Sequence, residues 1–413
     1  MKEISGIVNY KKTAIQLIIL FGLVSLFGDI VYEGARGVNG PYLKVLGANA
    51  IIVGLVAGIG EFMGYAIRLF SGYFSDKTKA YWIFTFLGYG MLISIPLLSL
   101  TGIWQIAVLF IVFERIGKAL RSPAKDTILS HATQQIGTGL GFGILEAMDQ
   151  IGAIAGPLIF AGLFFFSGVK DKTIVDYQHG YRFLWVPFVM VMFCLFLAYK
   201  RVPDPQHLET SLKKTEGPGK LTRIFWLYTI FSFVTTLGFA NFALIGYHFK
   251  AQHILSDAQI PLFYAIAMGV DAVVALLIGK AYDIFKNRNN NDKAGLSTLI
   301  IIPLFSLFIP ILAFSKSYMM AFASVILWGV VMGAHETIMR SAIADLTPLN
   351  KRGTGYGIFN TSYGFAILIG SSLMGLLYEK SLNLLVIGAV AVEILAIPIF
   401  FAMRKESLAL KSK

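Results

Sequence analysis

The stretch TAIQLIILFGLVSL (residues 13–26) contains no charged residue, and the ten residues that follow it, FGDIVYEGAR (27–36), contain three. A helix needs about 20 mainly apolar residues to cross the hydrocarbon core of a bilayer. Asp29, Glu33 and Arg36 recur at positions i, i+4 and i+7, so they share one face of a helix. The stretch therefore predicts a membrane-spanning helix with three ionisable side chains on one side.

The composition of the whole chain agrees with a membrane protein. Of its 413 residues, 56% are hydrophobic and only 14% are charged, whereas about a quarter of the residues of a soluble domain are charged. The single cysteine, Cys194, excludes an internal disulfide. The chain is predicted to be an integral membrane protein, with the bilayer as its main solvent.

Twelve apolar segments of roughly membrane-spanning length follow one another along the chain. Each is expected to be a helix, because lipid offers no partner for unpaired backbone groups. They lie at about 14–46, 50–74, 81–100, 104–122, 139–165, 182–200, 225–248, 261–283, 295–315, 318–340, 354–378 and 382–403. The predicted fold is an all-α membrane protein of twelve transmembrane helices.

Lysine and arginine indicate the orientation of these helices. If the N-terminus is cytoplasmic, 24 of the 35 basic residues fall in inner segments and only 7 in outer loops, the bias expected of a multi-pass protein. Both termini are therefore predicted to be cytoplasmic, in the plasma (inner) membrane. The net charge of +12 is explained by basic loops beside an anionic leaflet, without nucleic acid.

The segment KRVPDPQHLETSLKKTEGPGKLTR (200–223) predicts a cytoplasmic linker, because it is polar and contains proline and glycine. It separates a predicted N-terminal six-helix bundle (1–200) from a C-terminal one (223–413), with the linker at 201–222. GLGFGI (139–144) recurs as GTGYGI (353–358), a shift of 214 residues that also places Gly156 on Gly370. GYFSD (72–76) similarly matches GKAYD (279–283). Two matches at equivalent places predict two pseudo-symmetric bundles.

With these motifs the sequence resembles the Major Facilitator Superfamily. GYFSDKTK stands where that family has its loop 2–3 signature, with Gly72, Asp76 and Lys77 in place and Lys79 as the nearby cation. A glycine and proline pattern on helix 5 matches a second family signature through Gly143, Gly152, Gly156 and Pro157, while Phe160 and Ala161 replace its closing glycines. The resemblance implies transport by alternating access, and the helix 5 pattern is associated with exporters.

Physical arguments give these motifs roles of their own. Asp76 is expected in a tight cytoplasmic turn, where it would act as a gate by stabilising a facing helix N-terminus. Gly279 and Asp283 would form the corresponding gate of the second half, although Asp283 is equally well explained as a solvated acid. The helix 5 glycines are also explained by close helix packing, and Pro157 by a bend.

Ionisable residues inside a membrane are expensive, so they are functional candidates by default. Two acids one turn apart, Asp29 and Glu33, repel each other, and a water-poor cavity disfavours their charged forms. One of them is expected to exchange a proton, with Asp29 the first choice. The proposed proton-coupling set is Asp29, Glu33, Glu61 and Asp149, and the proposed cavity cations are Arg36, Arg68 and Arg115. Static salt bridges, such as Glu61 with Arg68 and Glu114 with Lys118, are the alternative interpretation.

The preferred function is proton-coupled efflux of a small molecule by a monomeric secondary transporter. The alternative is uptake or facilitated diffusion of a polar or anionic solute, and a membrane sensor or assembly factor is the third interpretation. An enzyme is disfavoured because the sequence has no nucleotide loop, metal-ligand cluster or nucleophile constellation. No catalytic residue, metal or cofactor is therefore expected. The identity of the substrate, the direction of transport and the coupling ion do not follow from the sequence.

Overall fold

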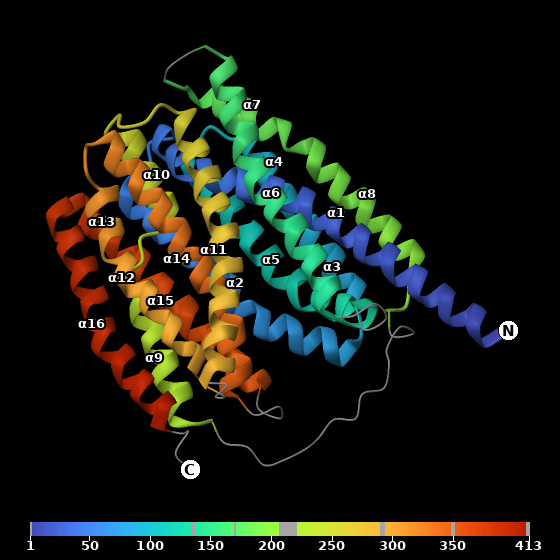
Figure 1. Ribbon diagram of the computed structural model, residues 1–413. Coiled ribbons are helices and arrows are strands. Elements are labelled where there is room, and N and C mark those ends of the chain that lie inside the picture. Colours follow the sequence, from blue (N-terminus) through green and yellow to red (C-terminus); the bar gives the residue numbers. More distant parts are fainter. Residues whose placement is uncertain are drawn as a thin grey trace. The chain divides into compact units, whose positions relative to one another are not determined.

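The computed structural model describes residues 2–133, 138–168, 171–205, 221–289, 294–347 and 352–409. These residues are almost entirely helical, and no strand occurs among them (Figure 1). Eleven helical spans in this part of the chain are long and apolar enough to cross a membrane. The remaining predicted span lies in α5 (Trp104–Thr133), a 30-residue helix that carries several charged residues. The protein is an all-helical, multi-pass membrane protein, as predicted.

The chain forms two compact units, residues 1–46 with 63–213 and residues 47–62 with 214–413. The first unit contains α1 (Lys2–Val45), the second part of α2 (Ala50–Thr78), α3 (Tyr81–Gly90), η1 (Met91–Ile93), α4 (Ser94–Leu97), η2 (Leu98–Leu100), α5, α6 (Thr138–Phe166), α7 (Ile174–Phe183) and α8 (Trp185–Arg201). Helix α2 is shared between the units, because residues 47–62 group with the second one. Most of the predicted linker, residues 206–220, lies outside the described residues, and the predicted domain boundaries stay a prediction.

The second unit contains the first part of α2 and all helices after the linker. These are α9 (Arg223–Gly238), α10 (Phe242–Ala251), α11 (Gln259–Asn289), η4 (Ala294–Ile300), α12 (Ile301–Ser306), α13 (Phe308–Ala313), α14 (Tyr318–Leu346), α15 (Arg352–Lys380) and α16 (Leu382–Ala409). The beginning of α2 packs on α15, where the backbone N–H of Ala50 donates to Glu379 Oε1 at 2.8 Å.

Several predicted spans are interrupted. The span at 81–100 passes from α3 through two 3₁₀ turns, with Pro96 in α4 between them. Pro303 and Pro310 stand in the short helices α12 and α13 of the span at 295–315. Proline removes a backbone donor and crowds the preceding turn, so short helical pieces are expected there. The span at 225–248 is also two helices, α9 and α10, although no proline lies in it.

Two glycines related by the predicted repeat make equivalent contacts in their own units. A Cβ on Gly156 of α6 would lie 2.6 Å from the carbonyl oxygen of Ile30 in α1. A Cβ on Gly370 of α15 would lie 2.5 Å from the carbonyl oxygen of Leu237 in α9. Each glycine thus allows the backbone of the fifth helix of its half to approach the first.

Candidate functional site

Helices α1 and α6 bring two carboxyl groups together in the first unit. Gly152 of α6 faces α1, and a Cβ there would lie 3.0 Å from the Cβ of Asp29. Because glycine leaves this space free, Asp29 can pack directly on α6. Asp149 stands three residues before Gly152, about one helical turn away. The charged groups that interact with Asp29 are Asp149, Lys118, Glu33 and Lys125.

Two lysines of α5 counterbalance these acids. Lys118 interacts with both Asp29 and Glu33. Lys125 interacts with Asp29 and Asp149, and its Nζ donates to the hydroxyl of Ser25 at 3.2 Å. Each residue of the α1/α5/α6 cluster, which is Asp29, Asp149, Lys118 and Lys125, is partly buried. The sequence placed Asp29 and Asp149 in one functional set, and the structure brings these two together.

The ring of Tyr32 forms a platform for cations in the same unit. Lys118 Nζ lies 3.7 Å from the ring centroid, and the guanidinium carbons of Arg115 and Arg36 lie 4.6 and 5.9 Å from it. Arg36 also pairs with Glu33 at 3.5 Å. An aromatic face attracts cations, so Tyr32 helps to hold three of them within a small volume. Sequence reasoning missed Tyr32, although it stands one residue before Glu33 and shares the polar segment 27–36.

A separate set of ion pairs fastens α5. Glu114 is buried and pairs with Arg121 at 3.4 Å and with Arg115 at 3.8 Å. Arg121 also donates to the backbone carbonyl of Gly88 at 3.2 Å and lies 4.8 Å from the ring of Tyr89. Glu114 thus pairs with two arginines, and it is also among the charged groups that interact with Lys118, its partner in the predicted static salt bridge.

The remaining predicted ionisable candidates lie in α2. The guanidinium of Arg68 lies 5.1 Å from the ring of Tyr65, and it is not among the main charged neighbours of Asp29. Glu61 belongs to the part of α2 that groups with the second unit. The α1/α5/α6 cluster therefore gathers residues of these three helices and includes neither of the two α2 candidates.

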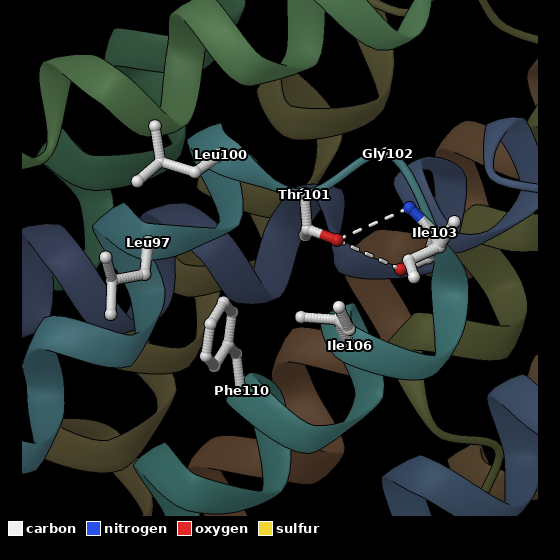
Figure 2. Close-up of a pocket in the computed structure, with 7 residues that line it drawn as sticks. All are labelled: Leu97, Leu100, Thr101, Gly102, Ile103, Ile106 and Phe110. Atoms are coloured by element: carbon white, nitrogen blue, oxygen red, sulfur yellow. Dashed lines mark hydrogen bonds between the residues drawn. The ribbon is translucent and has the colours of Figure 1, made fainter.

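A pocket of about 450 Å³ lies where η2 meets the beginning of α5. Its lining is apolar, with Leu97, Ile103 and Phe110 among its residues (Figure 2). Thr101 is its polar member, but its hydroxyl is used locally, donating to the carbonyl of Ile103 and accepting from that residue's N–H, both at 3.3 Å. This pocket offers no ionisable group and does not belong to the charged cluster.

The sequence profile of the Major Facilitator Superfamily matches residues 21–371 and 291–411. The chain belongs to this superfamily. This major facilitator is a membrane transporter and not an enzyme. In the part of the chain that the structure describes, no group of three His, Cys, Asp or Glu residues could hold a metal ion.

Two relatives align with most of the chain. An uncharacterized protein of Mycobacterium tuberculosis is 36% identical over 398 residues, covering 95% of this chain and 94% of its own. An uncharacterized MFS-type transporter of Methanocaldococcus jannaschii is 27% identical over 379 residues, covering 88% of both chains.

The fold is similar to those of solved transporters. The crystal structure of a bacterial homologue of the human lysosomal transporter Spinster, inward-facing and unoccupied, has a TM-score of 0.71 at 14% identity and covers 96% of this chain and 98% of its own. That of the nucleoside transporter NupG has a TM-score of 0.65 at 14% identity and covers 94% and 98%. At these identities the likeness concerns the fold alone.

The loop 2–3 signature lies inside α2, and the expected tight turn at Asp76 is wrong. Helix α2 ends at Thr78, and the next residue, Lys79, has a left-handed φ of 57°. Asp76 is exposed and accepts a hydrogen bond from the hydroxyl of Tyr81 at 3.3 Å. Lys77 lies 5.7 Å from the ring of Tyr73. The helix persists because no proline or glycine follows Gly72 before residue 79 to end it earlier.

The other signature residues divide into packed and open positions. Gly72 faces Pro123 of α5, with 3.5 Å from a Cβ to the ring, and Gly279 faces Thr337 at 3.3 Å. Gly152 and Gly156 are tightly packed on α1, whereas a Cβ on Gly143 would meet nothing within 4 Å. Pro157 lies inside α6, and Asp283 is exposed on α11. Close packing therefore explains the middle of the helix 5 pattern, which lies on α6.

Proposed function

We propose that this major facilitator exports a small molecule in exchange for protons, and that Asp29 is the carboxyl that gains and loses the coupling proton. The observation that carries the proposal is the pairing of Asp29 with Asp149 beside Lys118 and Lys125. Like charges held close in a membrane are costly, so one carboxyl of such a pair has reason to bind a proton.

The cluster has the composition that an exchange mechanism needs. When Asp29 releases its proton, its carboxylate can neutralise the charge of a lysine. When Asp29 binds a proton again, that lysine has one negative partner fewer. Protonation thus changes the charge of the cluster by one unit, and this would alter its affinity for a charged or polar substrate. Export is favoured because the helix 5 pattern on α6 is associated with exporters, and Gly152 of that pattern faces Asp29, whose Cβ would lie 3.0 Å from a Cβ on Gly152.

The three cations at Tyr32 favour a second candidate function. Arg36, Arg115 and Lys118 lie within 6 Å of one ring, and guanidinium groups match carboxylate and phosphate oxygens. On this interpretation the cations bind an anionic solute that is taken up or diffuses through, and the acids are their structural partners. In either function, Arg68 would be a further cation for substrate binding, and Glu61 would be an alternative acid for proton coupling.

The proposal includes an orientation, a location and a working unit. We place the transporter in the plasma (inner) membrane with both termini cytoplasmic, acting as a monomer on a small-molecule substrate. Asp76 with Gly72 and Lys77 would form the first inner gate, and Asp283 with Gly279 the second.

The test uses purified transporter in liposomes that enclose a pH-sensitive dye. Three probes of different charge are added in turn: tetraphenylphosphonium, uridine and glucose 6-phosphate. Proton movement driven by a probe identifies a coupled substrate class. Asp29→Asn should abolish this movement but keep counterflow exchange of the same probe, because exchange needs no net protonation. Glu33→Gln should instead weaken binding or folding, because Arg36 then loses its paired charge.

Glu146→Gln is the matched control, since Glu146 is an exposed carboxyl on α6 three residues before Asp149. It should leave coupled flux unchanged. Wild-type proton flux in Asp29→Asn and Glu33→Gln at every pH would overturn the coupling role of helix 1. Transport of glucose 6-phosphate without proton movement would favour the second candidate.

A further inference from the structure

Helices α9 and α10 together form the seventh predicted transmembrane span, the first of the second half. This span, called helix 7 below and distinct from α7, is interrupted within its apolar length. Helix α9 ends at Gly238 and α10 begins at Phe242, and between them Phe239 (φ −81°, ψ 119°) and Asn241 (φ −69°, ψ 139°) are extended. Backbone groups freed inside a membrane must find other partners. The side chain of Asn241 accepts from the N–H of Ala243 at 2.8 Å, and Trp328 Nε1 donates to the carbonyl of Ala240 at 3.0 Å.

A buried carboxyl lies against this interruption. Glu393 of α16 is 0% exposed, and its Oε1 would lie 2.7 Å from a Cβ on Gly238. The absence of a side chain on Gly238 therefore lets the carboxyl reach the last residue of α9. The hydroxyl of Ser306 donates to Glu393 Oε1 at 2.8 Å, while Oε2 has no hydrogen-bond partner within the described residues.

Among the described residues, no cation balances a charge on Glu393. Helix α16 packs against α9, α12, α13, α15 and η4. Across these elements, no charged or titratable side chain of the described residues interacts with its carboxyl, and Ser306 is its one polar partner. A carboxylate buried without a cation is unfavourable, whereas a neutral carboxylic acid with one hydrogen bond is tolerated. The site therefore fits the acid form.

We propose that Glu393 is a proton-binding site of the second half, which holds its proton while the interruption of helix 7 is closed around it. Movement of residues 239–241 would admit water and allow the proton to leave, so that occupancy and the conformation of helix 7 bias each other. Trp328, stacked on Phe239 at 5.7 Å, holds the closed form through Ala240. This site is independent of the proposed role of Asp29.

Infrared difference spectroscopy tests the protonation state directly, without a substrate. The spectrum of the wild type in lipid minus that of Glu393→Gln at neutral pH should show a carboxylic acid C=O band. Glu406→Gln is the matched control on the same helix, because Glu406 lies 3.9 Å from Arg223 and should contribute carboxylate bands. Carboxylate bands in the Glu393→Gln difference would overturn the proposal.

Hydrogen exchange of residues 239–242 tests the link to helix 7. Wild type and Glu393→Gln should exchange equally at acid pH, and at alkaline pH the wild type should exchange at least severalfold faster, because only its side chain can ionise. A structural role alone would not produce this pH-dependent difference, so equal rates at all pH values would refute the link.

Should Glu393→Gln not fold, Ser306→Ala replaces it in the infrared experiment. The carboxylic acid band must then shift in frequency, and an unshifted or missing band would contradict the site.

Discussion

The first transmembrane helices of the two halves accommodate polar groups inside the membrane in different ways. Helix α1 is a continuous helix of 44 residues that carries Asp29, Glu33 and Arg36. Its counterpart is divided into α9 and α10, and its polar groups at the division are backbone groups with the cap Asn241. Both place polarity inside the membrane, where each polar group needs a partner. In the first half the partners are opposite charges, and in the second half they are hydrogen bonds.

This difference contrasts with the shared packing of the halves. Gly156 and Gly370, related by the 214-residue repeat, meet backbone carbonyls of the first helix in their own unit. The repeat has kept the contact that sets helix spacing while the polar chemistry differs. Helix packing and site chemistry are thus separable properties of the same bundle.

The largest expected effect on stability comes from adding a methyl group at the glycine contact that the two halves share. Gly156→Ala and Gly370→Ala should each destabilise the protein by about 1–3 kcal/mol, because a Cβ at 2.6 or 2.5 Å from a carbonyl oxygen forces two helices apart. Thermal unfolding in detergent measures the effect. Similar losses at the two positions would sharpen the comparison, by showing that the repeat preserves packing.

Gly143→Ala and Gly269→Ala are the matched controls, one in each half. A Cβ at either position would meet nothing within 4 Å, and alanine favours a helix over glycine by about 1 kcal/mol. These variants should be neutral or more stable than the wild type. A loss at Gly143 equal to that at Gly156 would show that close packing is not the cause.

A smaller effect is expected from neutralising the two proposed gate acids, one in each half. Asp76→Asn should lower probe-driven proton flux by about two- to fivefold, the equivalent of about 0.3–1 kcal/mol for a carboxylate that faces the N-terminus of another helix in the proposed closed gate, without lowering expression. Asp283→Asn should have the weaker effect, because Asp76 has a defined partner in Tyr81, whereas Asp283 is adequately described as an exposed acid on the solvated end of α11. Flux in proteoliposomes is the measurement.

Tyr81→Phe separates charge from hydrogen bonding at the proposed first gate. It removes the donor to Asp76 but keeps the carboxylate, so flux should stay closer to that of the wild type than in Asp76→Asn. Full activity of Asp76→Asn would return Asp76 to the class of ordinary exposed acids. Equal losses from the Asp76 and Asp283 substitutions would make the two gates alike and weaken the contrast between the halves.

Periodicity and spacing predicted the part of the fold that one helix determines by itself. The apolar segments, the shared face of Asp29, Glu33 and Arg36, and the repeated glycines could be identified from the sequence. The interruption at Phe239–Asn241 could not, because its stability depends on Trp328 from a distant helix. Glu393 could be recognised from the sequence as an acid within an apolar span, but its environment could not, because Gly238 and Ser306 from other helices create it. The role of Tyr32 likewise depends on cations from two helices.

The smallest effect on the protein itself is expected from single cysteines that report topology. Asp171 and Lys316 stand in predicted outer loops, and Arg201 and Lys405 lie at predicted inner helix ends; all four are exposed. In a Cys194→Ser background, cysteines at the first two positions should react with an impermeant thiol reagent added to intact cells, and those at the last two only after permeabilisation. One outer and one inner position come from each half, so each half is tested separately. Labelling of Arg201→Cys or Lys405→Cys in intact cells would contradict the orientation predicted from loop charges. If only one half gave the reversed pattern, the two bundles could not be the parallel repeats that the comparison assumes.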